Sequence, residues 1–288
     1  MDLQFIKQLK QKHSLFRFWE GMSRQYARSL PPARPSSKAL ALYDEFIKTT
    51  NLDGETAVIL GSTPELRSLA ANYFRKIFVV DFSPAMLRVT NGLISSKILS
   101  KEVYRIAEWS HIADVCSPKT VDLVMGDSVF KQLDPAMWQR FLKGISSILK
   151  TGGVFITRVR IKKNHWRTAT TEDIIRISLR EWQDGHKDAS GTMIFRFYDK
   201  FADVNGRVSL DEHIPELKSA LADFSERSRR FVLKTVAAHH PHHVVWTHAS
   251  EEVFESEVRN YFAIENKRCA EDYLDSDAFP VYLFRNVT

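Results

Sequence analysis

Short apolar runs alternate with helical patterns over much of the first half of the chain. Residues 57–60 form an apolar run that ends at Gly61, and residues 77–80 form a second run that ends at Asp81. The segment between them begins near Pro64, which suits a first helical turn, and carries apolar residues at helical spacing. A strand, a helix and a second strand in this order predict a βαβ unit.

The alternation continues beyond this unit. Residues 103–107, 121–125 and 154–157 are predicted strands, and a helix is expected over 136–149, before a glycine stop at 152–153. Repeated strands and helices predict an α/β fold with a mostly parallel sheet that is covered by helices on both faces.

The first βαβ unit indicates a nucleoside ligand. Asp81 follows Gly61 by about 20 residues, the spacing at which a carboxylate at the end of the second strand binds the ribose hydroxyls of a nucleotide. The turn after the first strand has one glycine, and Glu65 follows in the first helical turn, where a diphosphate would otherwise lie. This combination favours S-adenosylmethionine, a nucleoside without phosphate. The alternative is an ordinary βαβ unit in which Asp81 only caps the next helix.

Other strand ends carry residues that suit the same ligand. Phe82 and Met86 follow the second strand and could press on an adenine, or equally belong to the core. Glu108 and Trp109 follow the third strand, where an acid can accept a hydrogen bond from an adenine amine beside an aromatic surface. Gly126 and Asp127 follow the fourth strand at the same edge of the sheet.

The remaining segments predict additions to this core. A helical pattern runs from residue 3 to about residue 30, and a proline-rich elbow separates it from a helix that begins near Ser36. Helices are also expected over 171–183 and 250–262, and strands over 263–269 and 279–285. We therefore divide the chain into an N-terminal arm or lid (1–50), a core (51–162), a cap or substrate region (163–248) and a segment that completes the core (249–288).

Composition adds few constraints. A net charge of +6 and a pI of about 9.2 are mild for 288 residues, and the basic clusters at 158–167 and 226–230 are short. A nucleic-acid partner is therefore not expected. Cys116 and Cys269 predict neither a disulfide framework nor a zinc site, and no segment has the pattern of a signal peptide or a membrane span. We expect a cytoplasmic protein without a membrane partner.

Five motifs give the chain a family resemblance. In order and spacing it resembles class I S-adenosylmethionine-dependent methyltransferases, and most closely a bacterial group with an LG-x-TPEL first motif. The motifs that carry the resemblance are VILGSTPEL, VVDFSPAML, AEWSHI, VDLVMGDSVF and LKTGGVFITR. The resemblance implies a Rossmann-like, doubly wound sheet of seven strands, of which the last is antiparallel, and S-adenosylmethionine as the cofactor.

The resemblance also implies roles for individual residues. The turn after the first strand would hold the methionine part of the cofactor, Asp81 the ribose, and Phe82, Met86, Glu108 and Trp109 the adenine. Asp127, beside Gly126, would lie near the sulfonium and face the cofactor's ammonium or the substrate. Three residues of the arm would close over the cofactor. The residues implied are Gly61, Ser62, Thr63, Pro64, Asp81, Phe82, Met86, Glu108, Trp109, Gly126, Asp127, Tyr26, Arg34 and Ser36.

The acceptor is less defined than the cofactor. Arg158, Arg196 and Tyr198 are candidates for substrate contact, and Asp127 or a cap histidine is the candidate base. The histidines at 239–248 lack a metal-ligand spacing, so no metal is expected. Methyl transfer to a small molecule is the leading hypothesis. A methyltransferase for RNA or protein and an inactive nucleoside-binding scaffold are the alternatives, and the pattern gives no oligomeric state.

Overall fold

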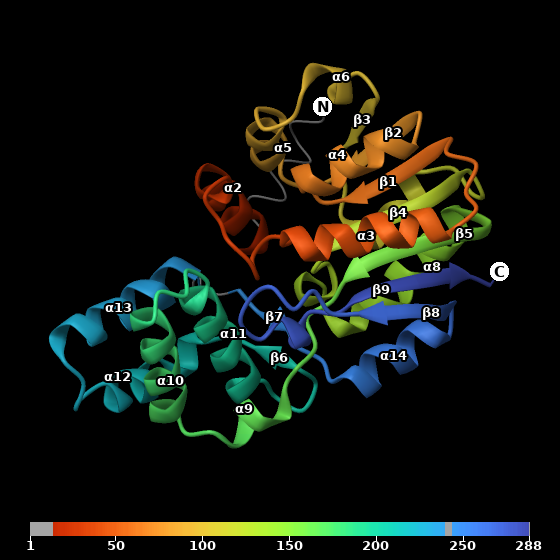
Figure 1. The fold of residues 1–288 in the computed structure, drawn as a ribbon. Helices are drawn as coiled ribbons and strands as arrows, with labels where there is room; N and C mark the ends of the chain where they lie inside the picture. Colours follow the sequence, from red (N-terminus) through yellow and green to blue (C-terminus); the bar gives the residue numbers. More distant parts are fainter. Residues whose placement is uncertain (1–13, 240–243, 288) are drawn as a thin grey trace.

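The predicted strands lie side by side in one sheet. The computed structural model describes residues 14–239 and 244–287, and the sheet has the order β3-β2-β1-β4-β5-β9-β8 (Figure 1). Strands β1 to β5 are parallel, whereas β9 is antiparallel to both β5 and β8. The predicted Rossmann-like sheet of seven strands with an antiparallel last strand is confirmed. The strands are β1 (Thr56–Leu60), β2 (Lys76–Val80), β3 (Glu102–Arg105), β4 (Val121–Asp127), β5 (Leu149–Arg158), β8 (Phe262–Arg268) and β9 (Val281–Asn286).

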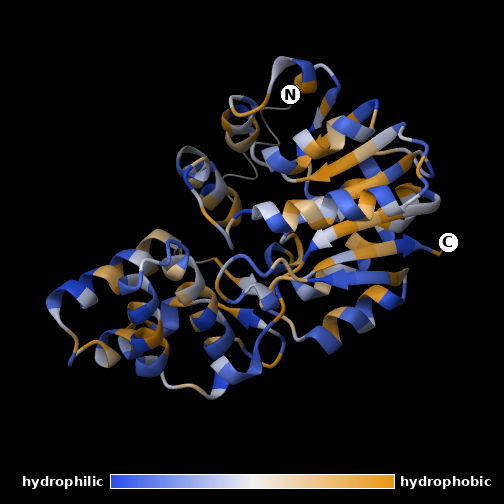
Figure 2. Cartoon of the chain, in the orientation of Figure 1, coloured by the Kyte–Doolittle hydropathy of each residue, from blue (hydrophilic) through white to orange (hydrophobic). Residues whose placement is uncertain are grey.

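Helices cover both faces of this sheet, as its nearly continuous apolar strands require. Along β1, Val58 and Leu60 pack on the face that α8 and α14 cover, and Ala57 and Ile59 on the face that α3 and α4 cover. Figure 2 shows hydrophobic residues concentrated along these strands. The helices of this part are α3 (Ser37–Thr49), α4 (Pro64–Tyr73), α5 (Pro84–Asn91), α6 (Ser96–Leu99), α7 (Ile112–Val115), α8 (Trp138–Ile148) and α14 (Glu251–Arg259), with short 3₁₀ turns η1 (Trp109–His111), η2 (Phe130–Gln132), η3 (Pro135–Met137) and η5 (Ser276–Ala278).

Polar caps begin several helices where the sequence predicts them. The Ser36 hydroxyl accepts from Ala39 N at the start of α3, and the Ser83 hydroxyl accepts from Met86 N at the start of α5. Pro64 is the first residue of α4. One expected boundary is wrong: α8 ends at Ile148, because Leu149 is already extended and pairs with Val121 as the start of β5.

The segment between β5 and α14 forms a helical cap, which lies at the lower left of Figure 1. Apolar residues of the cap form a hydrophobic cluster. Residues 193–201, MIFRFYDKF, lie in α11, and Met193 and Phe197 of this helix belong to that cluster. The cap elements are α9 (Asn164–Thr168), α10 (Thr171–Gln183), α11 (Ala189–Phe201), β6 (Arg207–Val208), η4 (Asp211–His213), α12 (Ile214–Ala220), α13 (Glu226–His239) and β7 (Trp246–Thr247).

Two buried charge networks join the cap to the core. Arg160, just after β5, pairs with Asp199 of α11, whose other oxygen lies 3.0 Å from His248 Nδ1. Arg196 of α11 forms ion pairs with Glu181 and with Asp275. These contacts fix the cap against the carboxyl edge of the sheet.

The N-terminal arm contributes α2 (Ser14–Tyr26) to the same edge. Glu20 of α2 accepts hydrogen bonds from the Ser83 hydroxyl (2.6 Å) and from Ala85 N (3.0 Å), both at the start of α5. The first part of the predicted N-terminal helix, residues 1–13, lies outside the described residues, as do His240, His242 and His243. No helix in the described ranges is long and apolar enough to cross a membrane.

Candidate functional site

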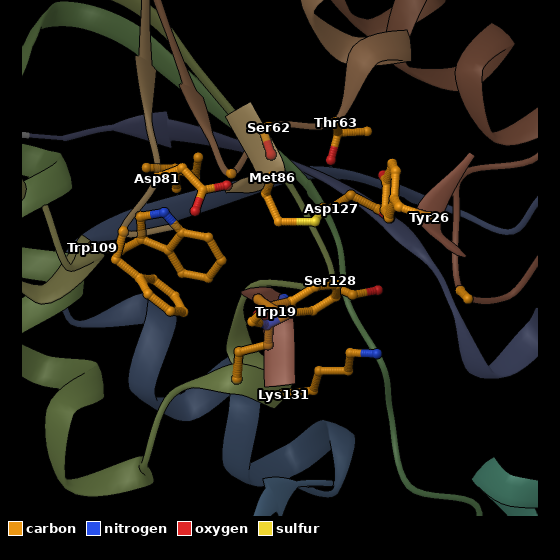
Figure 3. A pocket seen from close by; sticks show the side chains of 15 residues that line it. Trp19, Tyr26, Ser62, Thr63, Asp81, Met86, Trp109, Asp127, Ser128 and Lys131 are labelled. Atoms are coloured by element: carbon orange, nitrogen blue, oxygen red, sulfur yellow. The ribbon is translucent and has the colours of Figure 1, made fainter. Parts of the chain in front are cut away.

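A pocket lies at the carboxyl ends of β1, β2 and β4, where α/β sheets bind their ligands. Figure 3 shows Asp81 and Trp109 on one side, Tyr26 and Asp127 on the other, and Lys131 at the bottom. The cavity volume is about 50 Å³. Its lining residues are Trp19, Tyr26, Ala33, Leu60, Gly61, Ser62, Thr63, Asp81, Phe82, Met86, Trp109, Asp127, Ser128, Lys131 and Gln132.

Gly61 forms the floor of the pocket together with an indole ring. Its φ is +84°, a left-handed conformation that favours glycine. A Cβ at Gly61 would lie 3.3 Å from Trp109 Cζ2, and Trp109 Nε1 donates a 2.9 Å hydrogen bond to Val80 O that holds the indole in place. A bare backbone therefore faces the pocket beside an aromatic surface.

Asp81 places a buried carboxylate at the end of β2. Its Oδ1 accepts a 2.8 Å hydrogen bond from Ser83 N, a contact of the loop before α5. Burial raises the pKa of Asp81 to about 6, while hydrogen bonds from Ser83 and Ser62 oppose the shift and the Glu20 carboxylate adds to it. A ligand that donates hydroxyl hydrogen bonds to Asp81 would replace the lost hydration.

A second cavity of about 150 Å³ continues from the first. Both cavities are lined by Phe82, Trp109 and Gln132, and Glu108 lines the second one. The Glu108 carboxylate is one-third exposed and lies 3.9 Å from His111 Nδ1. Glu108 and Trp109 thus occupy the side of the site where the sequence predicts an adenine.

Asp127 enters the pocket as half of an ion pair. Arg158 Nε donates to Asp127 Oδ1 at 2.6 Å, and Arg158 Nη2 donates to Oδ2 at 2.9 Å. The two residues are register partners at the ends of β4 and β5. Arg158 is buried and also donates to Pro32 O (2.8 Å) and to the Tyr273 hydroxyl (3.1 Å). The Arg158 guanidinium thus donates a hydrogen bond to each oxygen of the Asp127 carboxylate.

The arm closes one side of the pocket. Tyr26 lines it, and burial, with the nearby Glu65 and Asp127 carboxylates, raises the pKa of the Tyr26 phenol. Arg34 lies behind Tyr26: its Nη1 donates to Tyr26 O at 3.3 Å, and the guanidinium pairs with Glu65 at the start of α4.

The structure brings together most of the cofactor residues predicted from sequence and separates the others. Gly61, Ser62, Thr63, Asp81, Phe82, Met86, Trp109, Asp127 and Tyr26 line the first cavity, and Glu108 lines the second. The remaining ones have local structural contacts outside the lining. Pro64 is the first residue of α4, and the Gly126 carbonyl accepts a hydrogen bond from the Tyr43 hydroxyl (2.7 Å). Arg34 pairs with Glu65, and the Ser36 hydroxyl donates to Asp272 Oδ1 (2.6 Å).

The three predicted substrate residues also lie outside the pocket lining. Arg158 forms an ion pair with Asp127. The Arg196 guanidinium forms ion pairs with Glu181 of α10 and with Asp275, which precedes η5. Tyr198 is buried in α11, with its ring 5.2 Å from the ring of His248. Burial raises the pKa of Tyr198.

Sequence reasoning missed Trp19, Ser128 and Lys131 as pocket residues. Ser128 and Lys131 directly follow β4, so their position after a strand end was the available signal. Ser128 has a φ of +54°, which turns the chain sharply at the pocket. Its hydroxyl and Trp19 Nε1 are buried and lack a hydrogen-bond partner within the described part of the chain. Two unpartnered polar atoms of pocket residues fit a bound polar ligand.

Metal ligands are not gathered at this site. Among residues 14–239 and 244–287, no group of three or more His, Cys, Asp and Glu side chains could hold a metal ion.

Comparisons with known proteins place the site within a known architecture. Residues 60–157 match the family described as a methyltransferase domain. No curated protein matches the sequence. A solved structure from Rhodobacter sphaeroides, described as a Zn-dependent alcohol dehydrogenase, has a TM-score of 0.61 and 17% identity over 96% of this chain and 99% of its own.

Two further structures share the fold. The N-methyltransferase NodS of Bradyrhizobium japonicum, in complex with S-adenosyl-L-homocysteine, has a TM-score of 0.51 and 10% identity over 94% of this chain and 98% of its own. A SAM-dependent methyltransferase of Methanosarcina mazei has a TM-score of 0.53 and 12% identity over 84% of this chain and 96% of its own. The matched residues 60–157 contain Gly61, Asp81 and Asp127, which line the pocket. Residues 60–157 thus match a methyltransferase domain, and the whole chain shares its fold with solved S-adenosylmethionine-dependent methyltransferases.

Proposed function

We propose that the protein transfers a methyl group to a small-molecule acceptor. The observation that carries this proposal is the aromatic lining of the site, to which the arm contributes two side chains. Trp19 and Tyr26 of α2 line the pocket, and the Lys131 side chain at its bottom contacts Phe195 and Trp246 of the cap. A site walled by aromatic residues on several sides suits a compact acceptor better than a polymer.

The basic cluster after β5 also favours a small molecule over RNA. Two of its arginines are buried, Arg158 against Asp127 and Arg160 against Asp199. Lys163 forms an ion pair with Asp277, and Arg167 is exposed. RNA binding depends on cations that can reach backbone phosphates, and this cluster offers few of them.

The chain's own residues would hold the cofactor. S-adenosylmethionine supplies an electrophilic methyl carbon when it is bound. We assign the ribose to Asp81, the adenine to the surface of Trp109 and to Glu108, and the methionine part to the turn at Gly61–Thr63. The polar atoms of Ser128 and Trp19 support this assignment, since they lack partners in the described residues of the free protein.

A labelling experiment tests the proposal. The protein is incubated with methyl-labelled S-adenosylmethionine and, separately, with small-molecule, RNA and protein fractions of a bacterial extract. Label is expected in the small-molecule fraction, and Asp81→Ala should abolish it. Asp114→Ala, an exposed acid on α7, is the matched control. Label in RNA or protein alone would refute a small-molecule acceptor.

Two finer assignments accompany this proposal. The Leu60–Leu66 motif, LGSTPEL, supports membership in the bacterial group with an LG-x-TPEL first motif. Cys116 and Cys269 are both free thiols, which supports a cytoplasmic location.

A further inference from the structure

Lys131 stands out among the residues that line the pocket. It lies in η2, directly after β4, so the same strand end delivers Asp127, Ser128 and Lys131 to the site. Figure 3 shows its side chain at the bottom of the pocket, below Ser128 and opposite Asp81. No carboxylate of the described residues forms an ion pair with it. A lysine without an acidic partner, inside a ligand pocket, is free to act on the ligand.

The surroundings of Lys131 come from the cap and the core together. Its Nζ lies 4.9 Å from the ring centroid of Phe195 and 5.1 Å from that of Trp246. Burial lowers the pKa of Lys131 to about 8. The Asp127 carboxylate opposes this shift, and the Arg158 and Arg160 guanidinium groups add to it. The charge of Lys131 also acts on His248. Burial lowers the pKa of His248 to about 4, so this histidine is neutral at physiological pH.

These observations give Lys131 the properties of a base. A substantial fraction of the amine is neutral near physiological pH, so its lone pair is available for a proton. The Arg158 and Arg160 guanidinium groups face it, and each is paired with a carboxylate, Arg158 with Asp127 and Arg160 with Asp199. A protonated Lys131 is therefore the cation of this region without a carboxylate partner among the described residues, so it disfavours a cationic acceptor and stabilises an acceptor that becomes negative when it loses its proton.

We propose that Lys131 is the base that accepts the proton of the methyl acceptor, and that this acceptor is a weakly acidic hydroxyl on an aromatic ring. This inference rests on the proposed function and names its acceptor. The O–H bond breaks, the proton forms a new N–H bond with the Lys131 lone pair, and the electron pair stays on the phenolic oxygen. The lysine ammonium then stabilises the phenolate until it returns the proton to solvent.

The rest of the chamber fits the same acceptor. Trp19 lines the pocket and supplies an aromatic surface on which a phenolic ring can pack, while Phe195 and Trp246 of the cap border the Lys131 ammonium. Ser128 is 4% exposed, and its hydroxyl lacks a hydrogen-bond partner within the described ranges, so it can donate to the phenolate oxygen. A base, a donor and aromatic walls therefore meet at one end of the pocket.

The test uses 4-nitrophenol, whose phenolate absorbs visible light, with the full-length protein and no cofactor. Binding to the wild type should lower the apparent pKa of the probe, seen as extra phenolate at a pH below its normal midpoint. Lys131→Met should remove this shift and weaken binding roughly tenfold or more. Lys143→Met, an exposed lysine on α8, is the matched control and should behave like the wild type.

A second variant separates the charge of Lys131 from its basicity. Lys131→Arg keeps a cation but stays protonated, so it should retain the probe shift. With a set of substituted phenols and S-adenosylmethionine, the wild-type rate should rise with pH through about 8. The rate of Lys131→Arg should not show this rise with pH. Its affinity for S-adenosylhomocysteine should stay within about twofold of the wild-type affinity.

The outcomes distinguish this inference from the proposed function. Equal probe shifts in the wild type and Lys131→Met, with S-adenosylhomocysteine still bound by both, would overturn the role of Lys131 alone. An unchanged pH limb in Lys131→Arg would also overturn it. Failure of the wild type to bind S-adenosylhomocysteine would instead remove the basis of the proposed function.

Discussion

Gly61 and Trp109 are in direct contact across the floor of the pocket. A Cβ on Gly61 would lie 3.3 Å from Trp109 Cζ2, and the hydrogen bond from Trp109 Nε1 to Val80 O prevents the indole from moving away freely. Gly61 also has a φ of +84°. The segments that follow β1 and β3 thus meet at Gly61, and both the backbone conformation and the shape of the pocket depend on this residue.

Gly61→Ala should therefore damage both stability and cofactor binding. The left-handed backbone costs about 1–2 kcal/mol for a residue with a Cβ, and the added methyl group crowds the indole. We expect a loss of folding free energy of that size in urea denaturation and a clear loss of S-adenosylhomocysteine affinity in calorimetry.

Gly152→Ala is the matched control for this prediction. Gly152 has a φ of +76°, but nothing lies within 4 Å of the position of its Cβ, and it is far along the chain from the pocket residues. It should lose similar stability and keep full affinity. Equal affinities of the Gly61→Ala variant and the wild type would contradict the contact as a determinant of the site.

Asp81 is predicted to make the free protein less stable at high pH. Its folded pKa is raised from 3.8 to about 6, so the folded state holds the proton more tightly than the unfolded state does. Stability from this group is present at low pH and falls as the pH rises from about 4 to about 6. A shift of this size corresponds to about 3 kcal/mol.

Asp81→Asn should remove this pH dependence. The asparagine oxygen can still accept from Ser83 N, and no buried charge forms. At pH 8 the variant should be more stable than the wild type by up to about 3 kcal/mol, and the difference should shrink below pH 6. Urea denaturation over a pH series measures it, with Asp114→Asn as an exposed control. A constant difference across the series would refute the shifted pKa.

The same variant should bind the cofactor more weakly. An amide is a poorer acceptor than a carboxylate for two ribose hydroxyls, so we expect a loss of roughly tenfold or more in S-adenosylhomocysteine affinity. Wild-type affinity should also fall below pH 6, as Asp81 takes up its proton. A variant that is more stable and binds less well would show that the buried carboxylate serves binding at the expense of stability.

Much of the fold and half of the site could be predicted from local patterns. Apolar runs define the parallel strands, and their ends give Gly61, Asp81, Trp109 and Asp127 because parallel strands deliver their carboxyl ends to one edge. The order of elements does not give the register between strands. Arg158 is therefore read as one of a basic cluster, although the register places it opposite Asp127 in a buried ion pair.

Lys131 shows the same limit more sharply. In sequence it is a lone lysine between Phe130 and Gln132, which is typical of a surface position. Lys131 is half-buried against Phe195 on α11 and Trp246 on β7, which are distant in the chain and are brought there by the packing of the cap. The position of Lys131 after β4 could indicate the pocket, but no local pattern gives its neighbours, because an environment made by three separate segments exists only in the folded chain.

Loss of one member of the Asp127–Arg158 ion pair should destabilise the fold, whereas replacement of both members should cost little folding free energy. Asp127→Asn leaves a buried guanidinium without its carboxylate, which typically costs about 3–5 kcal/mol of folding free energy. Asp127→Asn combined with Arg158→Met should recover most of that loss. Urea denaturation of the single and double variants measures the coupling.

An exposed ion pair provides the comparison. Glu226 and Arg230 lie one turn apart on the surface of α13, with an oxygen-to-nitrogen distance of 3.5 Å. Glu226→Gln should change stability by about 0.5 kcal/mol or less. Additive effects of Asp127→Asn and Arg158→Met, without recovery in the double variant, would contradict a coupled buried pair.

Glu20 should control how fast the cofactor enters and leaves. Trp19 and Tyr26 of α2 line the pocket, so an outward movement of α2 would widen the entrance for a nucleoside. Glu20 holds α2 against α5 through Ser83 and Ala85 N. Glu20→Ala removes both hydrogen bonds and should raise the association and dissociation rates of S-adenosylhomocysteine about tenfold.

Stopped-flow tryptophan fluorescence can follow these rates, since Trp19 and Trp109 line the pocket. Arg17→Ala, on the exposed side of the same helix, should leave both rates unchanged. Equal rates in Glu20→Ala and the wild type would mean that the cofactor enters without displacement of the arm.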